Sequence, residues 1–240
     1  MSVSDFIRQP PNLHDKIWRY MDLPKLIYLL DKRRLYLSRA DKYDDTHEGA
    51  TPLAQKNWEM ENHSKFSDRI ADFRCRQREW TFISCWSHCD HESHALWRIF
   101  CGPKQGVAVC SRYIRLVELL TNSQLDREVG LVDYGRDEPI PANTLIPFFR
   151  KRKAFAYEQE ARLVANIYRC LDVRDQTGKL LASRPCLEMP LDLATFIEAI
   201  RIHPEADAGY IDVVKSVVNK YACELLNRVE LSEMAKPPVF

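Results

Sequence analysis

The run Trp80-Thr81-Phe82-Ile83-Ser84-Cys85-Trp86 is the stretch on which the fold prediction depends. Its side chains are almost all apolar, a pattern typical of a strand that is covered on both faces. A strand with one face in water would instead alternate apolar and polar residues. The segments before and after this run must therefore supply the layers that cover it.

Strand-like and helix-like patterns alternate before this run. Asp22 can cap a helix that carries Pro24 in its first turn, where a missing N–H costs little. The apolar residues that follow recur at helical spacing. The segments expected here are strands over Ile17–Tyr20 and Leu35–Ser38, a loop over Asp41–Gly49 and a charged, helix-compatible stretch over Leu53–Arg78.

The same interleaving continues after the run. We expect helices over Glu92–Cys101 (with Leu96, Trp97, Ile99 and Phe100 on one side), Tyr113–Leu120 and Ala208–Leu226 (with Ile211, Val214, Val218, Tyr221 and Leu225 at core spacing). We expect strands over Gly106–Val109, Glu128–Tyr134, Tyr157–Ile167 from about Glu160, and a pair over Leu187–Leu191 and Phe196–Ile202. The order predicts an α+β fold of mixed, mainly antiparallel sheets with interleaved helices. Because the chain has 7 Gly and lacks a Gly- or Ser-rich linker, we expect residues 1–240 to form a single domain.

The composition gives no general reason to expect either of two classes of partner, so any site for an anion must be local. Lys and Arg total 35 and Asp and Glu total 34, so the overall charge does not favour nucleic acid or an anionic membrane. The first fifteen residues lack the features of a secretory signal, and no stretch of about eighteen apolar residues predicts a membrane span. We therefore expect a cytoplasmic protein. Its eight cysteines lie mostly in apolar segments, which is typical of reduced, buried thiols.

Two local clusters offer alternative sites. Cys85, His88, Cys89, His91 and His94, with Cys101 beyond them, are dense enough in thiol and imidazole to suggest zinc, although their spacing matches no paired C-x-x-C arrangement. The basic run Arg150-Lys151-Arg152-Lys153 is flanked by Phe148, Phe149 and Phe155. It could contact a nucleic-acid backbone, although such a run is more often a solvated face with its aromatic neighbours turned inward. Asp44, Asp45 and Glu48 form an acidic loop that could bind a cation or simply be a solvated turn.

Short motifs in a fixed order resemble a large bacterial family, the domain of unknown function numbered two-nine-seven-one. The motifs are Trp18-Arg19-Tyr20, Leu35 to Asp45 through Glu48-Gly49, Ser84-Cys85-Trp86 with Glu92-Ser93 and Leu96-Trp97, Gly106 to Val109, and Phe155 to Arg162, with Ile200 to Pro204 and Val229 to Ser232 fitting the family's ending. That family is distantly similar to ADP-ribosyltransferase-like domains. The resemblance implies NAD as substrate and a site made by an early basic residue, a later Ser or Tyr and a late Glu.

Carried onto this chain, the resemblance implies Glu160, Glu158, Arg19 and Ser38 as catalytic residues. The resemblance, together with the chemistry of the residue types, gives these candidates for binding NAD: Arg19, Tyr20, Ser84, Trp86, Trp97, Tyr157 and Arg162. No Ser-Thr-Ser triplet is present, so the choice between Ser38 and Ser84 stays open, as does that between Arg19 and Tyr20. Read alone, Arg19 suits a surface ion pair and Ser38 a turn.

The residue types suit ADP-ribosyl transfer, which passes through a transition state with oxocarbenium character. A carboxylate such as Glu160 stabilises the positive charge as it develops, and Glu158, two residues away on the expected strand, would share its face and serve the nucleophile. Arg162 would keep the carboxylates ionised, and Arg19 would bind the pyrophosphate. Trp86, Trp97 or Tyr157 would stack on a base, although both Trp residues lie in apolar runs that suit core packing.

The leading hypothesis is thus an NAD-dependent ADP-ribosyltransferase, for which the resemblance implies a role as a toxin or phage-defence effector with an antitoxin partner. The acceptor is unknown and could be protein or nucleic acid. The alternatives are a non-catalytic nucleotide- or nucleic-acid-recognition module of a defence system, and a zinc-dependent hydrolase that uses the Cys85 to His94 cluster.

Overall fold

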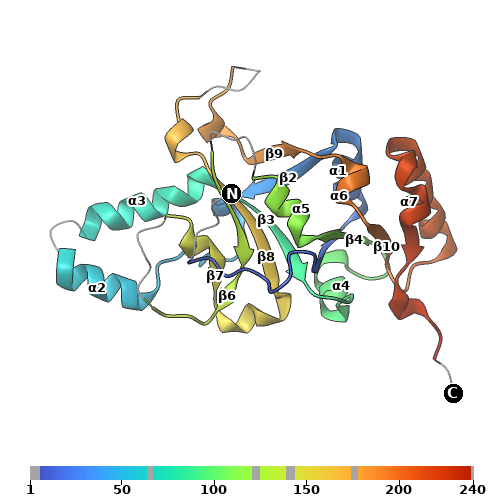
Figure 1. Cartoon of the computed structure of the whole chain (residues 1–240), viewed down its shortest axis with the longest axis horizontal. Coiled ribbons are helices and arrows are strands. Elements are labelled where there is room, and N and C mark those ends of the chain that lie inside the picture. Colours follow the sequence, from blue (N-terminus) through green and yellow to red (C-terminus); the bar gives the residue numbers. More distant parts are fainter. Residues whose placement is uncertain (1–5, 64–66, 121–124, 139–143, 174–177, 239–240) are drawn as a thin grey trace. The chain divides into compact units, whose positions relative to one another are not determined.

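The computed structural model describes residues 6–63, 67–120, 125–138, 144–173 and 178–238. It shows a mixed α+β fold whose strand pairs are mainly antiparallel, which confirms the predicted fold class (Figure 1). The chain divides into two compact units that are interleaved in sequence. Unit 1 comprises residues 1–11, 36–85 and 116–188, and unit 2 comprises residues 12–35, 86–115 and 189–240. The single domain over residues 1–240 stays a prediction.

The strands of unit 2 form a sheet around β1 (Lys16–Met21). β1 pairs antiparallel with β4 (Val107–Arg112) along its whole length and with the end of β3 (Thr81–His88). β10 (Ala199–Ile202) pairs antiparallel with β4 and parallel with β11 (Val229–Leu231). The segment Phe196–Ile202 is therefore not the hairpin partner of Leu187–Leu191 that the sequence suggested.

The helices of unit 2 begin at side-chain caps that the sequence supplies. Asp22 accepts the Lys25 N–H (2.9 Å) to start α1 (Leu23–Lys32), and Asp207 accepts the Tyr210 N–H (2.7 Å) to start α7 (Ala208–Tyr221). These two helices pack against one another. The other helices of unit 2 are α4 (His94–Cys101), α6 (Leu193–Phe196), η7 (Cys223–Arg228) and η8 (Glu233–Ala235).

Two predicted core faces are only partly right. In α4, Leu96 and Trp97 are buried, but Ile99 and Phe100 are exposed, because a helix this short buries one narrow stripe. Among the positions predicted for the last helix, Val214, Val218 and Leu225 are buried. Leu225 belongs to the separate turn η7, because α7 ends at Tyr221.

The strands of unit 1 surround the first half of β3, which is buried on both faces as predicted. β2 (Arg34–Arg39) pairs antiparallel with β3, and β8 (Glu160–Asn166) pairs with β3 and antiparallel with β5 (Asp126–Leu131). The remaining strands are β6 (Asp133–Tyr134) and β7 (Arg150–Lys151), which pair parallel, and β9 (Cys186–Pro190). The chain passes between the units within β2, β3, β9 and α5 (Tyr113–Glu118).

The helical stretch predicted over Leu53–Arg78 forms α2 (Leu53–His63) and α3 (Ser67–Trp80), and residues 64–66 lie outside the described chain. The short helices of unit 1 are η1 (Ala40–Lys42), η3 (Ile146–Phe149), η4 (Lys153–Glu158), η5 (Tyr168–Cys170) and η6 (Leu181–Ser183). An apolar cluster of unit 1 includes Ile83, Phe148, Phe149 and Val164. Among the described helices, none combines the length and apolar character needed to cross a bilayer. All eight cysteines are free thiols, but only Cys101, Cys110 and Cys170 are buried, so the expectation of mostly buried thiols is wrong.

Candidate active site

The two candidate carboxylates lie where η4 ends and β8 begins. Glu158 is the last residue of η4, Gln159 has a left-handed backbone (φ 44°), and Glu160 opens β8. Glu158 therefore does not lie on the strand, and the prediction that both side chains share one strand face is wrong. The tight turn at Gln159 nevertheless brings the two carboxyl groups to one cation.

That cation is Lys151, a residue of β7. Its Nζ donates to Glu158 Oε2 at 2.6 Å and to Glu160 Oε1 at 2.8 Å. The side chains of Lys151 and Glu158 are each 11% exposed, whereas that of Glu160 is 5% exposed. The side chains of Lys151 and Glu158 are thus slightly more accessible to solvent than that of Glu160.

Arg162 closes the other side of Glu160 and is completely buried. Its Nε donates to Glu160 Oε2 at 2.6 Å, and its Nη1 and Nη2 bind the two carboxylate oxygens of Glu48 at 2.5 and 3.0 Å. Nη1 also donates to the carbonyl of Phe148. Glu48, in the acidic loop after β2, is therefore buried in an ion pair with Arg162 and is not solvated, whereas cation binding by the loop as a whole stays a prediction.

The surroundings move the pKa values of the two carboxyls in opposite directions. Burial would raise the pKa of Glu160, but the charge and hydrogen bonds of Arg162 outweigh it and hold that pKa well below its usual range. Burial raises the pKa of Glu158 to about 7, against the opposing effect of Lys151. At neutral pH the pair therefore consists of a permanently ionised carboxylate beside one that can gain or lose a proton.

Two further side chains contact Glu160. The Glu160 N–H donates to the Tyr134 hydroxyl at 2.7 Å, and burial raises the pKa of that hydroxyl. Burial and the charge of Glu160 also raise the pKa of the Cys85 thiol, which contacts the Tyr43 hydroxyl at 3.6 Å. Cys85 is thus a protonated, half-buried neighbour of Glu160.

The strand register distinguishes the two serine candidates. Cys85 faces Glu160, so the neighbouring Ser84 points to the opposite face of β3, where it is fully buried. Ser38 pairs with Ile83 across the β2–β3 ladder and therefore shares the face of Ile83 and Cys85. The register favours Ser38 over Ser84 as the middle member of the site, a choice that the sequence left open.

The other candidate residues belong to unit 2. Arg19 lies with its guanidinium 5.8 Å from the centre of the Trp86 ring. Tyr20, on the other face of β1, accepts the Ser93 N–H at 2.7 Å and packs edge-on against Trp97 with ring centres 5.1 Å apart. Trp86 and Trp97 are buried, so both rings pack in the core, and stacking of either on a ligand stays a prediction that requires it to become exposed.

The exposed aromatic among the candidates is Tyr157, which lies on η4 beside Glu158. Three of the four basic residues after η3 already contact other groups of the chain, and nucleic-acid contact by this run stays a prediction. Arg150 donates to the Glu138 carbonyl, Lys151 is occupied by the carboxylate pair, and Arg152 pairs with Asp45. The flanking Phe148 and Phe149 are core residues, so they do not present faces on which bases could stack.

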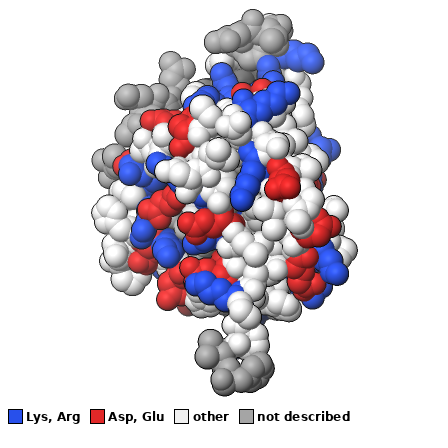
Figure 2. All heavy atoms as spheres, turned by 90° about the vertical axis from the view of Figure 1, so that its right-hand side faces the viewer, with Lys and Arg blue, Asp and Glu red and all other residues white. Residues whose placement is uncertain are grey.

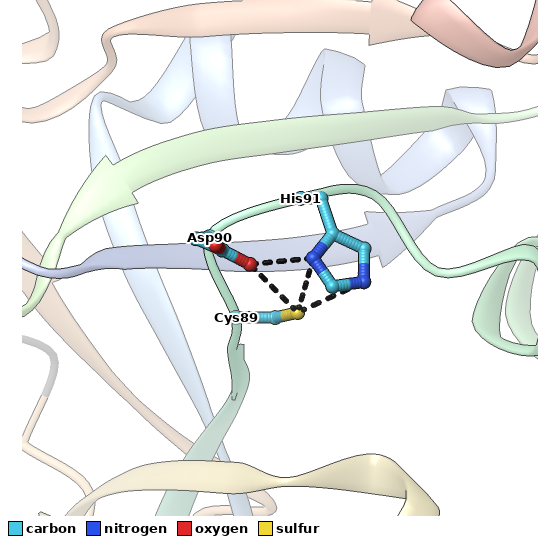
Figure 3. A group of neighbouring side chains, drawn as sticks. All are labelled: Cys89, Asp90 and His91. Atoms are coloured by element: carbon cyan, nitrogen blue, oxygen red, sulfur yellow. Dashed lines mark hydrogen bonds and ion pairs between the residues drawn. The ribbon is translucent and has the colours of Figure 1, made fainter.

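The proposed zinc cluster is not assembled. Cys85 lies in unit 1 beside Glu160, His88 Nε2 lies 3.0 Å from Asp15 Oδ2, and Cys101 is buried against the carbonyls of Met21 and Val107. What remains together is Cys89 and His91, joined by Asp90 (Figure 3). The hydrolase hypothesis based on the larger cluster therefore has no assembled centre among the described residues.

The visible surface agrees with the balanced composition. Figure 2 shows basic and acidic side chains interspersed over the face that it displays, without one sign gathering there.

Comparison with known proteins adds little to this geometry. No protein-family model matches the chain, and no curated protein does, so the resemblance to the bacterial family rests on the quoted motifs. Among solved structures, Thermus sp. 2.9 DarT in complex with ADP-ribosylated ssDNA aligns over 94% of this chain and 96% of that chain, with a TM-score of 0.41 and 13% identity. A likeness at this level leaves the function to be argued from the site itself.

Sequence reasoning missed two members of the site, Lys151 and Glu48. Lys151 was hidden in a run of four basic residues, and nothing local distinguishes it from its neighbours. Glu48 lies 114 positions from Arg162, so no sequence spacing indicates their pairing. The glycine next to Glu48, Gly49, was a usable signal that this loop packs closely against another part of the chain. A Cβ on Gly49 would lie 2.3 Å from the Phe148 ring, so the loop must approach the core there.

Proposed function

We propose that this chain transfers the ADP-ribosyl group of NAD to an acceptor, with Glu158 and Glu160 as the reacting pair. The observation that carries the proposal is the attachment of both carboxyls to the Lys151 ammonium, at 2.6 and 2.8 Å. This arrangement places a fixed negative charge beside a carboxyl that titrates near neutrality. The resemblance of Phe155 to Arg162 to ADP-ribosyltransferase-like domains supports the choice of reaction.

Each carboxyl has a distinct part in the reaction. The bond between the nicotinamide nitrogen and C1′ of the ribose breaks, and nicotinamide leaves with the bonding electrons. Glu160 stabilises the positive charge that develops on the ribose. An oxygen or nitrogen of the acceptor then bonds to C1′, and its proton passes to Glu158, whose pKa of about 7 suits a general base. Tyr157 stacks on the departing ring, and Ser38 orients the ribose.

Binding of the NAD phosphates by Arg19 of unit 2, whose guanidinium lies beside the Trp86 ring, is a separate part of the proposal. An Arg fork suits the two phosphates of NAD. Replacing Arg19 with Met should raise the KM for NAD while leaving kcat within a few-fold, because a phosphate contact acts on binding more than on the bond that breaks. Lys16→Met, a change of a basic residue on the same strand, is the matched control.

The decisive test uses NAD labelled in its nicotinamide ring. We expect the wild type to release label and Glu160→Gln to lose release, while Glu138→Gln, a change of an exposed glutamate in the same unit, keeps it. Near-ultraviolet circular dichroism verifies that each variant is folded. If Glu160→Gln does not fold, Glu158→Gln decides, since its release or transfer rate at pH 7 should fall at least tenfold. Equal rates for the folded variants and the wild type would refute the proposal.

A second function is favoured by one observation. Lys151 and Arg162 both neutralise Glu160, as they would in a purely structural network. On this reading the chain is a non-catalytic recognition module that binds a nucleotide or nucleic acid. Binding of NAD by the wild type without release of nicotinamide would support it. The biological role as a cytoplasmic toxin or phage-defence effector, with an antitoxin partner, belongs to the first proposal and rests on the family resemblance.

A further inference from the structure

The bend that follows β3 gathers three chemically matched side chains. Cys89 Sγ lies 3.4 Å from His91 Nδ1 and 3.6 Å from His91 Nε2, and Asp90 Oδ1 lies 3.8 Å from the sulfur (Figure 3). Asp90 Oδ1 and His91 Nδ1 are 2.5 Å apart. Consecutive residues in a strand would point to alternate faces, so the bend is what turns all three toward one point.

Both ends of this bend are tied to the body of unit 2. Before it, the Trp18 indole N–H donates to the Cys89 carbonyl at 3.0 Å, and His88 pairs with Asp15. After it, the Ser93 N–H donates to the Tyr20 hydroxyl. Because the backbone is held on each side, a ligand that bridges the three side chains has little backbone freedom left to remove.

The bend is also tied to the end of the chain. Glu92 Oε1 accepts the Glu233 N–H at 3.1 Å, and Glu92 Oε2 accepts the Ser232 hydroxyl at 2.5 Å. Of the three gathered residues, Asp90 and His91 are highly exposed, with side chains 92% and 76% accessible. The cluster is thus rigid in its backbone and open to solvent in its side chains.

A thiolate, an imidazole and a carboxylate are the three ligand types that zinc prefers. In a tetrahedral site with bonds of about 2.3 Å to sulfur and about 2.0 Å to nitrogen or oxygen, ligand atoms lie about 3.3 to 3.6 Å apart. The sulfur–nitrogen distances already fit. The Asp90–His91 distance must widen by about 0.8 Å to reach that separation, which the exposed Asp90 carboxylate can do by rotation.

We propose that Cys89, Asp90 and His91 form a surface site for a divalent transition-metal ion of the zinc class. The three residues supply three ligands, and water fills the remaining position or positions. On binding, the Cys89 thiol gives its proton to solvent and the sulfur bonds to the metal. The site does not depend on the proposed transferase activity, since all three ligands lie in unit 2 outside the carboxylate pair.

The test uses the full chain, stripped with a chelator and kept in a non-thiol reductant. It is titrated with Co²⁺ and, separately, with Zn²⁺ in competition with a chromophoric chelator. We expect one equivalent of Co²⁺ to give a thiolate-to-cobalt charge-transfer band in the near ultraviolet, and Zn²⁺ to displace it. Cys89→Ser should abolish the band, and His91→Gln and Asp90→Asn should each weaken zinc binding at least tenfold.

Matched controls are an exposed cysteine and an exposed histidine elsewhere in the chain. Cys223→Ser and His47→Gln should bind metal as the wild type does. Near-ultraviolet circular dichroism of Cys89→Ser should match the wild type, because serine keeps the side chain's shape. The proposal is overturned if the wild type takes up no metal, if the band survives in Cys89→Ser, or if it disappears in Cys223→Ser.

Discussion

Glu160 in unit 1 and Glu92 in unit 2 are both removed from water, with side chains 5% exposed, but they are accommodated differently. Glu160 is held by two cations, Lys151 and Arg162. Glu92 accepts hydrogen bonds from neutral groups, which are the indole of Trp97, the hydroxyl of Ser232 and the backbone N–H of Glu233, and Arg201 stands 3.9 Å away.

The difference separates a structural carboxylate from one suited to chemistry. The neutral donors to Glu92 come from α4 and from the segment at residues 232–233, so Glu92 acts as a joint that links these two segments. Lys151 and Arg162 keep Glu160 ionised, and Lys151 also holds Glu158, which can gain or lose a proton near neutral pH. A buried acid surrounded by cations and by a second acid is an arrangement that costs stability and is typical of reactive sites.

The largest effect should come from removing the cation on which Glu160 depends. Arg162→Met leaves the buried carboxylate of Glu48 without its charged partner and Glu160 with Lys151 alone, and should lower the free energy of unfolding by about 3–5 kcal/mol. Urea denaturation measures this loss. Arg169→Met, which breaks an exposed ion pair with Asp126 in the same unit, is the control and should change stability far less. Similar losses for the two variants would mean that the buried network is not ionic.

The corresponding substitution in unit 2 should cost less stability, but it should also affect hydrogen exchange at residues distant in sequence. Glu92→Gln places an amide N–H₂ against donor groups and should cost about 1–3 kcal/mol. Hydrogen exchange should rise at residues 232–235, because these residues lose their anchor. Glu230→Gln, which changes an exposed partner of Arg201, should leave that exchange unchanged. Unaltered protection in Glu92→Gln would contradict the role of Glu92 as a joint.

The two regions share one kind of hydrogen bond, and removing it in each region should give two comparable, smaller losses of stability. A tyrosine hydroxyl accepts a backbone N–H at 2.7 Å in each, from Glu160 to Tyr134 and from Ser93 to Tyr20. Tyr134→Phe and Tyr20→Phe should each lower stability by about 1 kcal/mol, as measured by thermal unfolding. If Tyr134→Phe also lowers the proposed activity while Tyr20→Phe does not, the chemical assignment of unit 1 gains support.

The last effect is a pH dependence specific to Glu158. Its pKa is raised in the folded chain to about 7, so the folded state binds this proton more tightly than the unfolded state does. The contribution is therefore complete below the ordinary glutamate pKa and is lost as pH rises through about 7. Unfolding at several pH values between 5 and 8 should show the wild type losing stability relative to Glu158→Gln. Parallel curves would show that Glu158 titrates normally.

The sequence predicted correctly those elements whose signals lie within a few neighbouring residues. The Asp22 cap, the apolar run before Trp86 and the start of β8 at Glu160 were all predictable, because capping and burial leave a signal within a few residues. The exposure of Ile99 and Phe100 was not, since it depends on how far α4 is covered by the rest of unit 2.

The candidate site was predictable only in part, for a similar reason. Glu160 and Arg162 lie two apart on a strand, which the sequence shows directly. Glu158 reaches the same cation only because Gln159 adopts a left-handed backbone conformation, which the sequence did not predict. Lys151 and Glu48 come from other elements, so their contacts with the pair are set by tertiary packing.

The shared Lys151 ammonium has a consequence for proteolysis. Four consecutive basic residues, Arg150 to Lys153, would make this segment a prime target for trypsin in an unfolded chain. In the native protein the protease cannot take Lys151 into its specificity pocket while two carboxylates hold that side chain. The rate of cleavage after Lys151 during native digestion would therefore report how often Lys151 is released from the two carboxylates. This measurement needs no knowledge of the substrate.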